Sequence, residues 1–144
     1  MYLKWDDRYS VGIETFDHQH KQLFEIINTL FTYIKARNIL KAASKGAVNK
    51  KPLEETLNEL LNYTKIHFNA EELEMLSHGY PGYEKHKKEH DEFASRVADF
   101  ILRVNRGEAV LTAEVLNSLV NWLDHHMYGT DKLYSPFLTS KGVK

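Results

Sequence analysis

The sequence of 144 residues has no cysteine, only three prolines and no long apolar run. Without cysteine there are no disulfide bonds, iron-sulfur clusters or thiolate zinc sites, so any bound metal must be held by nitrogen and oxygen. No stretch approaches the roughly 20 consecutive apolar residues that a membrane-spanning helix needs, and the N-terminus lacks the apolar region of a signal peptide. We therefore expect a cytoplasmic protein with no membrane partner.

The charges are almost balanced, with 19 basic and 20 acidic residues and a formal net charge of −1. This balance argues against binding to nucleic acid or to an anionic membrane through bulk charge. A chain of this length with 42% hydrophobic residues can bury a core of its own. We expect a single domain spanning residues 1–144, and a monomer.

Four segments carry apolar residues at spacings of three and four, the period that places side chains on one face of a helix. These stripes cover residues 13–34, 53–75, 83–104 and 116–126, and the third includes Phe100. Turn residues separate the segments. The pattern predicts an all-α fold, an antiparallel up-down-up-down four-helix bundle with helices of roughly 18 to 24 residues.

The flanking segments are expected to add little. Residues 1–12 are predicted to form an extended arm whose Trp5 and Tyr9 lie over the bundle. Residues 36–52 form a basic connection, better interpreted as a solvated loop than as a docking patch. Residues 132–144 are predicted to form a short helix or tail. The residues of this tail that we expect to pack against the bundle are Leu133, Tyr134 and Phe137.

Polar residues interrupt the apolar stripes of all four predicted helices. They are His20, His67, Glu71, His86, His90, His126 and Asp131. Such groups are costly to bury without partners, and native domains leave few of them unsatisfied. Seven separately satisfied polar groups in one small core are a much weaker explanation than a shared metal site.

Nearby polar residues lie off the stripes and are not expected to bind metal. His18, His78 and His125 are interpreted as exposed or partly exposed side chains. Glu72 and Glu74 flank Glu71 and are expected to be solvated, although Glu72 is also placed to support a metal ligand from behind.

Seven ligands exceed the four to six that one first-row metal ion accepts, so two ions sharing bridging carboxylates are the economical solution. Glu71 and Asp131 are the natural bridges. The donor set suits iron, manganese, zinc or copper, and donor type does not choose among them.

One spacing departs from regular helix geometry. His126 and Asp131 are five residues apart, and five residues turn an ideal helix by about 500°, which leaves the two side chains roughly 140° out of line. The spacing predicts a π-type widening or an unwinding around residues 127–130, eased by Gly129.

The chain resembles the hemerythrin family, specifically the single-domain bacterial hemerythrins. The resemblance rests on the segments DHQHKQLF, HFNAEE, GYPGYEKHKKEHDEF and WLDHHMYGTDKLY, which contain all seven candidate ligands. It implies two iron ions per chain in a non-haem di-iron centre. One iron would be bound by His86, His90 and His126, and the other by His20 and His67. Glu71, Asp131 and an oxo or hydroxo group would bridge them.

The resemblance also implies a function. Dioxygen would bind reversibly, as hydroperoxide, at an open position on the second iron, and the chain would carry, store or buffer oxygen without acting as an enzyme. An oxygen-consuming enzyme is a candidate partner. The apolar residues expected to wall the pocket are Phe24, Phe68, Trp122 and Leu123. The alternatives are an oxygen or nitric oxide sensor acting through a partner, a di-iron peroxidase or oxidase, and a zinc or iron storage bundle.

Overall fold

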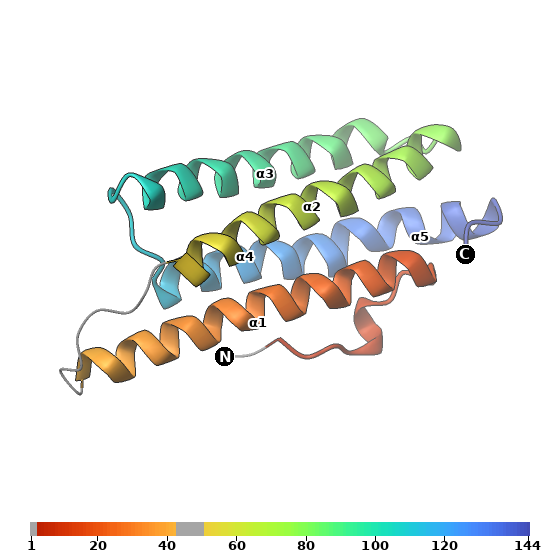
Figure 1. Cartoon of the computed structure of the whole chain (residues 1–144). Helices are drawn as coiled ribbons and strands as arrows, with labels where there is room; N and C mark the ends of the chain where they lie inside the picture. Colours follow the sequence, from red (N-terminus) through yellow and green to blue (C-terminus); the bar gives the residue numbers. More distant parts are fainter. Residues whose placement is uncertain (1–2, 43–50) are drawn as a thin grey trace.

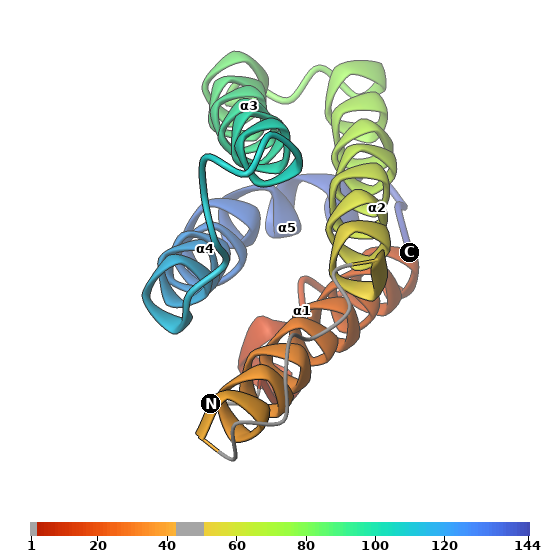
Figure 2. The same ribbon diagram turned by 60° about the vertical axis from the view of Figure 1, so that its left-hand side comes forward.

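The helices run in alternating directions along the chain, as Figure 1 shows. The computed structural model describes residues 3–42 and 51–144. Its elements are the short 3-10 turn η1 (Asp7–Tyr9), α1 (Glu14–Ala42), α2 (Lys51–Ser77), α3 (Tyr83–Asn105), α4 (Ala113–His125), the π-helical segment η2 (His126–Thr130) and α5 (Asp131–Ser140). The predicted all-α bundle is confirmed. Viewed more nearly along the bundle, α1 to α4 surround a common interior (Figure 2).

Short turns hold neighbouring helices antiparallel. After α2, Gly79 takes a positive φ of 69°, and the backbone N–H of Tyr80 donates to the carbonyl of Met75 at 2.9 Å. This is the arrangement that closes a helix C-terminus with a glycine in the left-handed conformation. Gly107 does the same after α3. At the start of α4 the Thr112 hydroxyl accepts a hydrogen bond from the N–H of Val115, which caps the helix.

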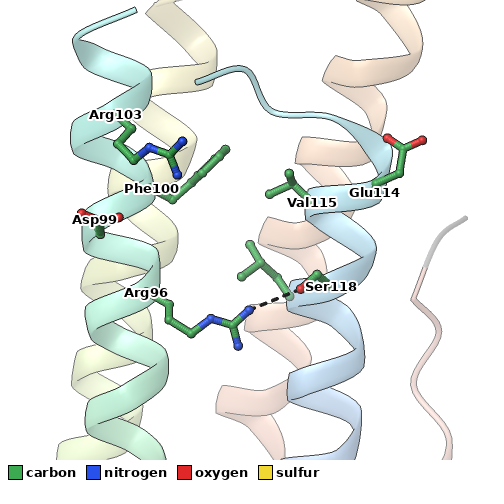
Figure 3. Close-up of a pocket in the computed structure, with 8 residues that line it drawn as sticks. Arg96, Asp99, Phe100, Arg103, Glu114, Val115 and Ser118 are labelled. Atoms are coloured by element: carbon green, nitrogen blue, oxygen red, sulfur yellow. Dashed lines mark hydrogen bonds between the residues drawn. The ribbon is translucent and has the colours of Figure 1, made fainter. Parts of the chain in front are cut away.

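The predicted stripes form the core, with one correction. Near the C-terminal end of α3, Ile101 is buried, whereas Phe100, which the pattern places in the stripe, is only partly buried. Phe100 lines a surface pocket of about 430 Å³ between α3 and α4. Figure 3 shows Arg96 crossing this pocket to donate a hydrogen bond to the Ser118 hydroxyl at 3.4 Å.

The N-terminal arm packs over the bundle as predicted. The ring of Phe24 lies 6.0 Å from Trp5 and 5.2 Å from Tyr9, measured between centroids. The Tyr9 hydroxyl also donates to Asp124 of α4 at 2.7 Å. Phe24 is therefore part of the contact with the arm.

Two expectations about the other flanking segments were wrong. Residues 36–42 continue α1 and residues 51–52 begin α2, so both ends of the predicted basic connection are helix and not loop. Residues 43–50 of this connection lie outside the described residues. Leu133 is 68% exposed, whereas Tyr134 is completely buried. Because residues 131–140 form a regular helix, only one of its faces can meet the bundle.

The predicted distortion between His126 and Asp131 is present. Residues 126–130 are π-helical, and the N–H of Asp131 donates to the carbonyl of His126, five residues earlier. A π-turn holds more residues than an α-turn, so residues five apart come close to the same face. This one turn brings the carboxylate of Asp131 back to the bundle interior.

The core of α2 provides a test of the fold. Leu60 is completely buried, whereas Leu73 on the same helix is 65% exposed. We expect Leu60→Ala to reduce the free energy of unfolding by about 2–5 kcal/mol, because it removes apolar contacts and leaves a cavity. Leu73→Ala should change it by less than about 0.5 kcal/mol. Urea unfolding of both variants measures the difference, and similar losses would contradict this packing.

Candidate metal centre

Five imidazoles and two carboxylates meet at one end of the bundle. Because the helices are antiparallel, the start of α1, the end of α2, the start of α3 and the segment after α4 all reach this end. All seven predicted residues are there, and none is more than 2% exposed.

Every one of the five imidazoles turns its Nε2 atom toward a carboxylate. Nε2 of His67 and of His90 lie 3.2 and 3.3 Å from Oε1 of Glu71. Nε2 of His86 and of His126 each lie 3.0 Å from Oδ1 of Asp131. The shared orientation leaves the Nδ1 atoms free to contact the surrounding shell, which is how histidines are usually held at metal sites.

His20 stands between the two carboxylates. Its Nε2 lies 3.2 Å from Oδ2 of Asp131 and 3.8 Å from Oε2 of Glu71. Each carboxylate therefore faces imidazoles with both of its oxygens. A carboxylate placed in this way can bridge two cations.

The ligand atoms divide into two overlapping groups, each able to surround a cation. One group contains His86, His90 and His126, and the other contains His20 and His67. Glu71 and Asp131 belong to both groups. Within each group all the ligand atoms lie within 4.8 Å of one another. The arrangement is uneven, with three imidazoles in one group and two in the other.

Several of these buried atoms make no hydrogen bond within the described part of the chain. They are Nδ1 and Nε2 of His20, Nε2 of His86, Oε1 of Glu71 and both carboxylate oxygens of Asp131. Orphaned donors and acceptors in a core are destabilising unless a ligand satisfies them. Nitrogen and oxygen atoms converging from four helix segments fit transition-metal cations.

The electrostatics agree with a cation site. Burial would raise the pKa values of Glu71 and Asp131, but the neighbouring imidazoles hold both well below their usual range. Burial lowers the pKa of His20, but the neighbouring carboxylates of Asp131 and Glu71 outweigh it and raise this pKa to about 9. The carboxylates thus stay ionised and require positive charge nearby. When no metal is bound, protonated imidazoles supply this positive charge, and metal cations displace those protons when they bind.

Polar side chains around the cluster contact the Nδ1 atoms of three of the imidazoles. Nδ1 of His67 lies 2.6 Å from Oε1 of Gln19, and Nδ1 of His90 lies 2.7 Å from Oε2 of Glu72. Nδ1 of His126 has a longer contact, 3.4 Å, with Oε1 of Glu89. These acceptors orient the rings and raise the basicity of the Nε2 atoms. The two carboxylate acceptors both support the three-imidazole group, whereas an amide supports the two-imidazole group.

Tyr134 adds a contact to a bridging carboxylate. Its hydroxyl donates a short hydrogen bond to Oε2 of Glu71, and the side chain is completely buried. Burial and the charges of Glu71 and Asp131 raise the pKa of this tyrosine well above its ordinary value, so the hydroxyl keeps its proton. Tyr134 therefore helps to hold Glu71 in place.

Aromatic rings cover the three-imidazole group. Phe68 stacks on His90 with ring centroids 3.7 Å apart, and Trp122 stacks on His126 at 4.6 Å. Such packing fixes the imidazoles and limits access of water.

The structure also separates ligand candidates from their neighbours. His18 and His125 are exposed, and His78 is half-buried against Glu74. The supporting position expected for Glu72 is confirmed by its contact with His90. Gln19 and Glu89 were missed. Each lies next to a ligand in sequence, Gln19 before His20 and Glu89 before His90, but each supports an imidazole of another helix, which no local spacing reveals.

Fold and site together define a helical-bundle protein with a histidine-carboxylate centre for two cations. The chain belongs to the hemerythrin family, since residues 11–138 match the model of the hemerythrin HHE cation binding domain. Hemerythrins are oxygen-binding proteins with a non-haem di-iron centre rather than enzymes.

Similar proteins of known family support this assignment. It is 34% identical to bacteriohemerythrin of Stenotrophomonas maltophilia over 92% of this chain and 79% of that protein. It is 32% identical to bacteriohemerythrin of Methylococcus capsulatus over 86% of each chain. A crystal structure of wild-type hemerythrin superposes with a TM-score of 0.85 at 28% identity, covering 96% of this chain and 99% of that one.

The described residues contain no helix with the length and apolar character needed to cross a bilayer.

The contact between Glu72 and His90 can be tested by substitution. We expect Glu72→Ala to weaken iron binding about 10- to 100-fold, because His90 loses the carboxylate that orients it. Glu74→Ala is the matched control: Glu74 lies two residues further along α2, and its carboxylate pairs with His78, away from the centre. Titration of both metal-free variants with ferrous iron in competition with a chelator measures the change, and equal affinities would contradict the role of Glu72.

Proposed function

We propose that His20, His67, Glu71, His86, His90, His126 and Asp131 bind the two iron ions of this chain, and that the centre binds dioxygen reversibly for carriage, storage or buffering. His86, His90 and His126 would hold one iron, His20 and His67 the other, and the two carboxylates would bridge them. Bound iron supplies the electrons that dioxygen needs in order to bind reversibly.

The uneven division of imidazoles carries this proposal. If each iron also took one oxygen from each bridging carboxylate and one bridging solvent oxygen, the first would have six ligands and the second five. The second iron would then have a position for a small ligand beside His20 and His67. A centre in which both irons had six ligands would bind metal but leave no position for dioxygen.

The surroundings suit binding more than further chemistry on the ligand. Leu23 follows His20 by one turn, and Leu123 precedes His126 by one turn, and both are buried. Phe68 and Trp122 add aromatic rings on the side of α3 and α4. These walls exclude water and offer few groups that could protonate and cleave a bound ligand. The only carboxylates among the proposed ligands are Glu71 and Asp131, which favours reversible binding over oxidation of a second substrate.

We further propose that residues 1–144 act as a single cytoplasmic domain and as a monomer, with no nucleic-acid or membrane partner. The nearly balanced charge supports this, because nothing in it favours a polyanion. An oxygen-consuming enzyme that receives the bound oxygen is the partner that best suits such a role.

The experiment that tests reversible binding is an absorption spectrum of the reduced, iron-loaded protein before and after exposure to air, with iron counted per chain. We expect two iron ions per chain and a visible absorption band that appears in air and disappears under vacuum through repeated cycles. Irreversible oxidation within seconds, or consumption of peroxide or nitric oxide over many turnovers, would instead identify an enzyme.

Substitutions at the proposed ligands should separate them from the neighbouring histidines. We expect Glu71→Ala and His126→Ala to lose iron and oxygen binding together, because each removes a buried ligand of the cluster. His18→Ala and His125→Ala should keep both, since these side chains are exposed. The measurement is iron content by atomic emission alongside the absorption band. Loss of iron in the His18 variant would refute the proposed ligand set.

A further inference from the structure

Thr64 is a buried threonine whose hydroxyl has no partner. It lies on the inner stripe of α2, between Leu60 and His67, and is completely buried. Its Oγ1 makes no hydrogen bond with any residue that the structure describes. An unpartnered hydroxyl in an apolar core is destabilising, so it requires an explanation.

Other threonines inside helices of this chain avoid that cost. Thr29 donates to the carbonyl of Glu25 at 3.1 Å, Thr56 to that of Pro52 at 2.8 Å, and Thr139 to that of Ser135 at 2.7 Å. Each bond joins a hydroxyl to the carbonyl four residues earlier, the usual local partner of a helical threonine. Thr64 makes no such bond with Leu60. Its hydroxyl is therefore available to another acceptor.

The position of Thr64 in α2 places its hydroxyl close to His67, so the acceptor must lie near this histidine. Thr64 precedes His67 by three residues, so the two side chains are neighbours on one helix face, with Cβ atoms about 5–6 Å apart. Helical side chains lean toward the N-terminus, so the imidazole of His67 reaches back over the turn that contains Thr64. His67 belongs to the two-imidazole group. The hydroxyl thus lies beside the half of the centre that has fewer ligands.

The residues that lie one helical turn inward from the proposed ligands form a layer of the core. Besides Thr64, this layer contains Leu23 after His20, Phe93 after His90 and Leu123 before His126, which are apolar and at most 1% exposed. Thr64 is the polar member of the layer. Valine has nearly the same shape and would fill the same space without an unsatisfied hydroxyl, so packing alone does not account for threonine here.

We propose that the Thr64 hydroxyl donates a hydrogen bond to the small ligand bound at the two-imidazole iron, and so selects ligands that carry an acceptor. The inference rests on the proposed function, because it requires iron in this half of the centre. The ligand class is a diatomic or short linear molecule with oxygen or nitrogen acceptors, including anions such as azide. Thr64 would then be a specificity-determining residue of the pocket.

The test compares Thr64→Val, which keeps the shape and removes the hydroxyl, with Thr64→Ser, which keeps the hydroxyl. Azide is titrated into each iron-loaded ferric protein and followed by absorption. We expect Thr64→Val to weaken azide binding about tenfold or more, because a hydrogen bond to a charged acceptor is lost. Thr64→Ser should stay within about threefold of the unchanged protein. Thr56→Val is the control, because Thr56 is a half-buried residue near the start of α2 whose hydroxyl is bonded to the carbonyl of Pro52, and this variant should bind azide normally.

A second measurement does not depend on iron. In the metal-free protein, Thr64→Val should raise the melting temperature by a few degrees, because it removes an unsatisfied buried hydroxyl. No rise would mean that the hydroxyl has a partner there, and would overturn the inference. Unchanged azide affinity in Thr64→Val at two iron ions per chain would overturn it as well. Failure of the proposed function would look different, since the unchanged protein itself would lack two iron ions or a vacuum-reversible oxygen band.

Discussion

The burial of two carboxylates at one end of the bundle determines how the helices and their polar side chains are arranged. Glu71 and Asp131 are fully excluded from solvent, and removing charge from water is tolerated only where opposite charge and hydrogen bonds compensate for it. Five imidazoles from four helix segments converge on these carboxylates. Without bound cations the core would contain several orphaned polar atoms, so folding and metal binding are coupled.

The π-helical segment is the local feature that makes this convergence possible. A regular α-helix through residue 131 would direct His126 and Asp131 to different faces. The wider turn returns Asp131 to the interior, and the helix then continues as α5, which brings Tyr134 against Glu71. One irregular turn thus supplies a bridging carboxylate and a hydrogen-bond donor for the other bridge.

The sequence predicted the bundle and the gathering of all seven polar residues, because both follow from helical period and the cost of burying polar groups. It predicted the π-segment because a single spacing conflicted with regular geometry. It singled out Glu72 as a support but not Gln19 or Glu89, since the sequence does not show which polar neighbours of the ligands meet an imidazole of another helix. Phe100 was misplaced because it lies at the margin of its helical face, where the packing of neighbouring helices decides burial. Leu133 was misplaced because it lies on the face of α5 that does not meet the bundle.

The proposed iron centre is uneven, with three imidazoles on one iron, two on the other and a position for a small ligand on the second. Anomalous diffraction at the iron edge from crystals of the iron-loaded protein tests it most directly. It should give two peaks per chain, one among His86, His90 and His126 and one beside His20 and His67, with Glu71 and Asp131 between them. A single peak, or two irons with equal numbers of protein ligands, would contradict it.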